Sequence, residues 1–159
     1  MQTASPRPTK PRAPQPWDFV GIIRFEGRDG LRRRYQALAP FAHLLLLYGD
    51  KELLMPRRWY RSPQLCSSLA MLQAQWEDLR KPDALPWVAC RFWAQDLSGL
   101  RESCKGAGTE SDPMPKPRGF VMPNALSDYL ASDEFDKVCL GLERIDEEEQ
   151  RYPYPGVAA

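Results

Sequence analysis

The stretch SPQLCSSLAMLQAQWEDLR, residues 62–80, is the clearest structural signal in this chain of 159 residues. Ser62 can cap a helix with its hydroxyl, and Pro63 suits the first helical position, where no backbone N–H is needed. Apolar side chains then recur at helical spacing in one stripe, which comprises Leu65, Leu69, Leu72, Trp76 and Leu79. The stretch therefore predicts an amphipathic helix that ends near Arg80, before Pro82.

A second amphipathic helix is predicted over residues 132–149, with Ser132 as its cap. Its apolar face consists of Phe135, Val138, Leu142 and Ile145. Its first turn contains three acidic residues, Asp133, Glu134 and Asp136. Negative charge is stabilising at this positive end of a helix dipole, so these carboxylates are not interpreted as catalytic. The run Asp146–Glu149 lies at the negative end, where its charge is unfavourable, and it either frays or meets a cation.

Three other segments predict β-structure. The first, Trp17–Phe25, is rich in aromatic and β-branched residues and ends at the glycines of 27–30, as a strand before a turn does. Residues 41–55 read as a hairpin around Gly49-Asp50, although a leucine run suits a buried helix equally well. The third segment, Trp87–Ala94, is apolar on nearly both faces, which is typical of a central strand.

These elements predict an α+β fold: one domain with a small, mostly antiparallel sheet packed against the two amphipathic helices. Residues 31–38 have apolar side chains at helical spacing and form a short helix, or else a strand that pairs back across the glycine turn. A further short helix is expected near residues 125–130. The domain extends over 17–150, with a mobile loop at 100–118 where glycine and proline accumulate.

The two ends of the chain have a different composition from this domain. Residues 1–16 contain five prolines together with Arg7, Lys10 and Arg12, which predicts a disordered, basic arm. Residues 151–159 are interpreted as a C-terminal tail. The first residues lack the apolar core of a secretory signal, and the longest apolar stretch is shorter than the ~20 residues of a membrane helix. We therefore expect a soluble, cytoplasmic protein with no membrane partner.

Charge is sorted along the chain although the formal net charge is only +1. Residues 1–62 carry twelve Lys/Arg against five Asp/Glu, whereas residues 119–159 carry three against nine. Such asymmetry favours a basic surface for polyanions, or self-complementary association between the two halves.

Neither the cysteines nor the single histidine predict a metal or catalytic site. Cys66, Cys90, Cys104 and Cys139 are too widely spaced for the short pairs of a zinc site. Because no export signal is found, they are expected to be reduced, and mostly buried in the predicted helices and strands. His43 lies between an alanine and four leucines, where a core histidine is the ordinary outcome. The glycines after Lys105 lack the spacing of a phosphate-binding loop. No catalytic motif is found, so the sequence predicts no enzyme, no cofactor and no metal.

Two arginine clusters are the candidate functional residues: Arg32, Arg33 and Arg34, and then Arg57, Arg58, Trp59, Tyr60 and Arg61. The second cluster mixes guanidinium groups with aromatic rings, a combination that holds phosphates while bases stack. The alternative for Arg32–Arg34 is the solvated face of a helix. The alternative for the second cluster is that Trp59 and Tyr60 anchor an edge of the fold. The function predicted from these clusters is that of a small accessory protein that binds DNA or RNA.

A second function class rests on the acidic end of the chain. Asp146, Glu147, Glu148 and Glu149 are candidate partner-binding residues of a protein-interaction module or inhibitor. Such a surface would engage a basic protein partner, or the basic half of the chain itself, and its carboxylates could imitate a phosphate backbone. The two classes differ in what they require: exposed Trp59 and Tyr60 on a basic face for the first, and an acidic or apolar face for the second.

Overall fold

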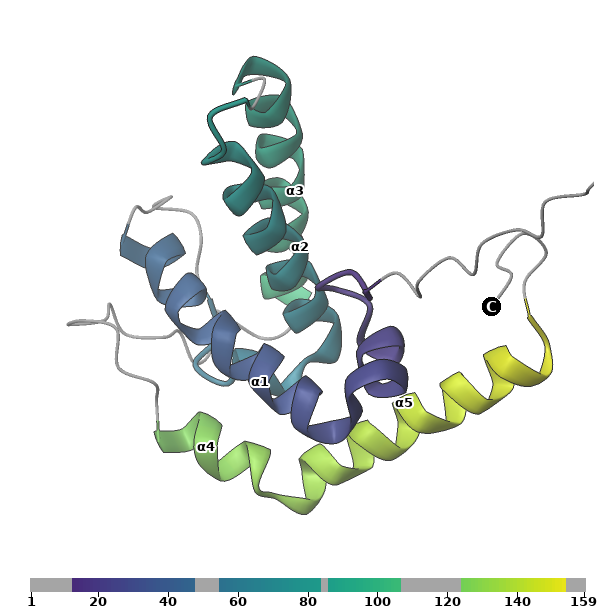
Figure 1. Cartoon of the computed structure of the whole chain (residues 1–159). Helices are drawn as coiled ribbons and strands as arrows, with labels where there is room; N and C mark the ends of the chain where they lie inside the picture. The colour runs from purple at the N-terminus through teal and green to yellow at the C-terminus, as the bar shows by residue number, and fades with distance from the viewer. Residues whose placement is uncertain (1–12, 48–54, 84–85, 107–123, 154–159) are drawn as a thin grey trace, which may run out of the picture.

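A computed structural model describes residues 13–47, 55–83, 86–106 and 124–153 of the chain. These residues form helices and no β-strand (Figure 1). The elements are α1 (Phe19–Leu47), the 3₁₀ turn η1 (Trp59–Arg61), α2 (Pro63–Leu79), α3 (Pro86–Gly106), α4 (Asn124–Leu130) and α5 (Asp133–Arg151). The predicted α+β fold with a small antiparallel sheet is therefore wrong, and the described fold is helical.

The first predicted strand is the beginning of α1. Asp18 starts this helix by accepting a hydrogen bond from the backbone N–H of Gly21, at 2.9 Å from Oδ1. The buried residues of α1 then follow a three- to four-residue spacing, which a helix uses and a strand does not: Phe19, Ile22, Ile23, Leu31, Tyr35, Leu38, Ala42 and Leu45. Packing against the other helices thus overrides the β-propensity of the aromatic and β-branched residues.

The other two β predictions are corrected in the same way. Residues 41–47, the start of the predicted hairpin, continue α1, while residues 48–54 lie outside the described part of the chain. The predicted strand Trp87–Ala94 is the first half of α3. This helix continues to Gly106, so the first residues of the predicted 100–118 loop are helical, and Leu100 and Cys104 are buried within it.

The predicted α2 and α5 are confirmed together with their caps. Ser62 Oγ accepts from the N–H of Leu65 at 3.2 Å, and Ser132 Oγ accepts from the N–H of Phe135 at 3.4 Å. Pro63 occupies the first position of α2, as expected. The acidic run does not fray, because α5 stays helical up to Arg151.

The helices pack in two groups that share one core. Helices α2 and α3 lie side by side as a pair that projects from the rest of the molecule, and α2 also packs on α1 (Figure 1). Helix α5 crosses below α1, and α4 precedes it along the same edge (Figure 1). The rings of Trp76 and Trp93, 5.7 Å apart, join α2 to α3. Among the described residues, no helix is long and apolar enough to cross a membrane.

The predicted N-terminal arm is described only in part. Residues 1–12 lie outside the described ranges, whereas residues 13–16 lead directly into α1. There the N–H of Asp18 donates to the carbonyl oxygen of Gln15 at 3.0 Å. Of the predicted tail at 151–159, residues 154–159 are likewise outside the described part of the chain.

Gly27 breaks α1 into two helical segments, residues 19–26 and 28–47. Its φ of 72° and ψ of −170° belong to a region of backbone conformation that only glycine adopts readily. The break lies where the sequence predicts a turn between two separate elements. One helical segment ends there, and the next begins in a different direction.

Replacing Gly27 with alanine is expected to lower the free energy of unfolding by about 1–3 kcal/mol, because a β-carbon is strained at this φ and ψ. Gly141→Ala is the matched control. Gly141 lies inside α5 with open space at its β-carbon position, so alanine there should stabilise the protein by about 0.5–1 kcal/mol. Urea denaturation of both variants measures the two effects, and a change of the same sign in both would contradict the role assigned to Gly27.

Candidate functional site: the charged junction of α1 and α5

Three arginines on one side of α1 meet the carboxylates of α5. These residues, Arg24, Arg28 and Arg32, are spaced by four and are called the arginine row below. Residues four apart share one face of a helix. The bend at Gly27 lies between the first two, and the row still reaches α5 along its length.

Arg24 holds the acidic end of α5. Its Nε lies 2.5 Å from Asp146 Oδ1, and its Nη2 lies 3.2 Å from Glu149 Oε2, so one guanidinium group spans two carboxylates. The hydrogen bond with Asp146 raises the pKa of Arg24 further above its ordinary value. Of the two outcomes predicted for the acidic run, the meeting with a cation is confirmed.

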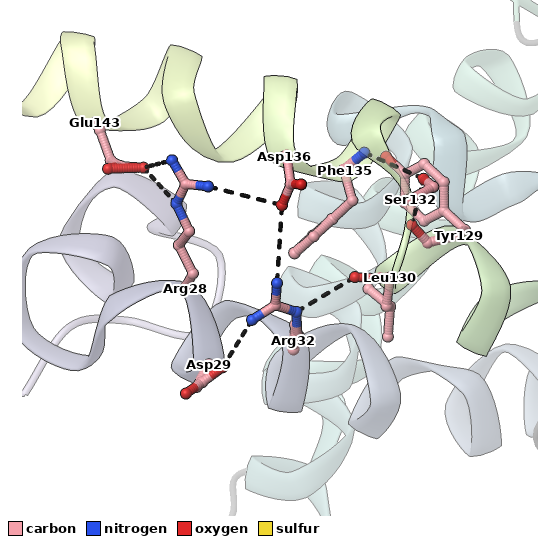
Figure 2. A network of polar contacts seen from close by, with 9 residues as sticks. All are labelled: Arg28, Asp29, Arg32, Tyr129, Leu130, Ser132, Phe135, Asp136 and Glu143. Carbon is pink, nitrogen blue, oxygen red and sulfur yellow. Dashed lines mark hydrogen bonds and ion pairs between the residues drawn. The ribbon is translucent and has the colours of Figure 1, made fainter.

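Arg28 and Arg32 continue the contact toward the start of α5, as Figure 2 shows. Nε and Nη2 of Arg28 lie 2.6 and 2.5 Å from the same oxygen of Glu143, and this hydrogen bond raises the pKa of Arg28. Asp136 lies between the two arginines, 3.6 Å from Arg28 and 3.8 Å from Arg32. Three arginines of the basic half are therefore paired with four carboxylates of the acidic half within the fold.

Arg32 also contacts residues of α1, α4 and α5. Its Nη1 contacts Asp29 at 2.7 Å, and its Nε donates to the carbonyl oxygen of Leu130 at 3.3 Å (Figure 2). Its guanidinium carbon lies 5.4 Å from the centre of the Phe135 ring, within the range of a cation–π contact. Of the first predicted cluster, Arg32 thus faces α5 and is half-buried, as is Arg34, and Arg33 is exposed.

The second predicted cluster is divided between core and surface. Trp59 and Tyr60 are buried, with their rings 5.7 Å apart, and Tyr60 packs on Tyr129 at 5.1 Å. Arg61 contacts Glu134 at 3.3 Å, whereas Arg57 and Arg58 are exposed. The two rings are therefore unavailable for stacking on bases, because neighbouring side chains already cover them.

The core around these rings contains neutral polar groups. Burial raises the pKa of the Cys66 thiol to about 12, and its Sγ lies 3.6 Å from the carbonyl oxygen of Tyr60. Burial also raises the pKa of Tyr129 to about 12. Cys66, Cys104 and Cys139 are buried as expected, and His43 is buried in α1. Within the described ranges, no group of three or more His, Cys, Asp or Glu side chains is arranged to hold a metal ion.

The outer side of the C-terminal half of α5 carries exposed apolar side chains. Ile145 is 48% exposed, and Tyr152, directly after the helix, is 69% exposed. Both line an open hollow of about 360 Å³, together with Arg144, Glu148 and Glu149. Glu149 is already paired with Arg24, whereas Glu148 and the exposed Glu147 form no ion pair within the described part of the chain.

Sequence reasoning missed Arg24 and Arg28, which hold the acidic end of α5. The four-residue spacing of Arg28 and Arg32 was visible, but Arg24 lies in the helical segment before Gly27, and only the packing on α5 places it in line with them. Interpreting Trp17–Phe25 as a strand placed Arg24 and Arg32 in different elements. The helical spacing of Trp93, Leu97, Leu100 and Cys104 could likewise have identified α3.

Searches against known protein families, curated proteins and solved structures found no match to this chain.

Proposed function

We propose that the protein is a helical protein-interaction module that binds a partner along the outer side of α5. The proposal rests on one observation: Ile145 and Tyr152 are exposed beside an open hollow at the end of a long helix. Exposed apolar side chains that gather at a concave surface are typical of binding sites, whereas isolated ones are ordinary.

The charges around this hollow indicate the chemistry of the partner. The hollow is lined by two carboxylates, Glu148 and Glu149, against one cation, Arg144, and Glu148 forms no ion pair among the described residues. A partner segment that presents apolar side chains flanked by lysine or arginine would match them. An amphipathic, basic helix satisfies this description and can pack its apolar face against Ile145 and Tyr152.

The interaction function is preferred to nucleic-acid binding because of how the arginines and aromatic rings are used. A stacking surface requires exposed rings, and Trp59 and Tyr60 are buried. Arg32 and Arg61 are already paired with Asp136 and Glu134. The exposed Arg33 and Arg58 remain as charges without rings beside them, which supports at most a weak, unspecific attraction for polyanions.

A designed peptide tests the proposal directly. The probe is a fluorescently labelled 18-residue amphipathic helix with leucine on one face and lysine on the other, and its binding is followed by anisotropy. The double variant Ile145→Ser/Tyr152→Ser should bind it at least tenfold more weakly than the native protein, because both apolar contacts are removed. A second peptide with glutamate in place of lysine should bind much less well, because Glu148 and Glu149 at the hollow repel it.

Leu140→Ser is the matched control. Leu140 is also in α5 and is 44% exposed, but it lies about 140° around the helix axis from Ile145. Its replacement should leave the affinity unchanged within twofold. Equal losses in the control and the double variant, or no binding of the lysine peptide to the native protein, would refute the docking site on α5.

A further inference from the structure

Within the described residues, the carboxylates that contact the arginine row come mostly from one helix. Asp136, Glu143, Asp146 and Glu149 belong to α5, while Asp29 of α1 and the carbonyl oxygen of Leu130 in α4 contact Arg32 as well. The carboxylates thus form a linear series of negative charges along α5. A row of arginines that binds such a series is chemically suited to a linear series of phosphates as well.

The contacts themselves resemble phosphate recognition. Two nitrogens of Arg28 converge on one oxygen of Glu143, and two nitrogens of Arg24 hold two separate carboxylates. Guanidinium groups bind carboxylate and phosphate oxygens with the same planar arrangement of N–H donors. The oxygens of α5 therefore stand where phosphate oxygens would be bound.

The half of α5 that covers Arg24 is held by these charges and by Leu142, which packs against the core from its middle. The fully buried side chains of α5 are Phe135 and Cys139, both in its first two turns, whereas Ile145 near its end is exposed. Ion pairs that remain in contact with water contribute little stability each and weaken as salt rises. Displacement of this end by a competing anion would leave Phe135 in the core.

We propose that the arginine row is a binding site for a linear phosphate polymer, and that α5 occupies this site as an internal competitor. Single-stranded nucleic acid and inorganic polyphosphate share the required chemistry, a flexible chain of closely spaced negative charges. In the resting protein the carboxylates of α5 neutralise the row. A polymer gains access when it displaces them, so the native protein binds it weakly.

The test replaces the four carboxylates of α5 that contact the row with neutral amides of nearly the same shape. The variant Asp136→Asn/Glu143→Gln/Asp146→Asn/Glu149→Gln should bind fluorescein-labelled dT20 at least tenfold more tightly than the native protein at low salt. The log–log dependence of its affinity on salt should have a slope of about −2, as expected for three phosphates neutralised on a single strand. Circular dichroism checks that the helices remain. Should this variant fail to fold, Asp146→Asn/Glu149→Gln frees Arg24 alone and should give a smaller gain.

A second variant separates release of the arginine row from the change in net charge. The variant Glu77→Gln/Asp83→Asn/Asp128→Asn/Asp133→Asn also removes four negative charges, but at exposed positions that do not contact the row. It should bind dT20 within threefold of the native protein. Adding Arg24→Ala/Arg28→Ala/Arg32→Ala to the four-carboxylate variant should abolish its gain.

Inorganic polyphosphate should displace dT20 from the four-carboxylate variant, because the row binds phosphates and not bases. Three results would overturn the proposal: a folded four-carboxylate variant that binds no better than native, a gain of the same size in the charge control, or no displacement by polyphosphate.

Discussion

Replacing Phe135 with alanine is expected to lower the free energy of unfolding by about 3–5 kcal/mol, the usual cost of removing a buried phenylalanine. Its side chain is fully buried, and its ring packs edge-on against Tyr35 at 5.5 Å and Tyr129 at 5.8 Å. Arg32 covers its remaining side from α1. The substitution therefore leaves a cavity at the point where α1, α4 and α5 meet.

Denaturant unfolding, followed by circular dichroism, measures this effect. Ile145→Ala serves as the control, because Ile145 is on the same helix but half-exposed, and it should cost less than about 1 kcal/mol. If Phe135→Ala also cost less than about 1 kcal/mol, α5 would not be anchored in the core. No buried side chain at the start of α5 would then hold the helix while its C-terminal end is displaced.

Leu72→Ala is the second substitution with a large expected effect, about 2–5 kcal/mol of unfolding free energy. Leu72 is buried in the middle of α2, on the stripe that includes Leu65 and Leu69. Helix α2 packs on both α1 and α3, so a cavity at this position disturbs the contact between the two groups of helices.

The neighbouring residue supplies the control for this measurement. Met71 precedes Leu72 in the same helix but is 36% exposed, so Met71→Ala should cost less than about 1 kcal/mol. Both variants are compared by urea denaturation under the same conditions. Similar small costs at both positions would mean that the stripe of α2 does not form the core.

The two proposals for α5 concern neighbouring residues of its C-terminal end. Asp146 and Glu149 contact Arg24, whereas Ile145 and Tyr152 line the hollow, which Glu149 also borders. The experiments use different variants: Ile145→Ser/Tyr152→Ser changes no residue of the arginine row or its carboxylates, and the arginine-to-alanine variant changes no residue of the hollow. Either proposal can therefore fail while the other stands.

Local sequence signals determined α2 and α5 almost completely. In both, a serine cap and an apolar stripe agree with each other, although Ile145, the last residue of the predicted stripe of α5, is exposed. The end of α2 near Arg80 and the burial of Phe135 follow from the same local pattern. These helices were predictable because their propensity, capping and periodicity all favour one structure.

The state of residues 17–25 and 87–94 was decided by tertiary structure. Both segments are apolar on nearly all sides, and a short run of that kind fits a buried helix as well as a buried strand. Neighbouring elements decide between helix and strand. They cover every second side chain of a strand, but every third or fourth side chain of a helix. Here Phe19, Ile22 and Ile23 are covered by other helices, and no described strand offers hydrogen bonds to this backbone.

Sequence patterns were enough to show that basic and acidic residues are concentrated at opposite ends of the chain, and that the acidic run needs a cation or frays. That Arg24 supplies this cation, and that Trp59 and Tyr60 belong to the core instead of a binding face, follows from the packing of the helices. Arg24 and Asp146 are 122 residues apart. Charge pairing and burial at such separation depend on how the helices cross, and no local pattern contains that information.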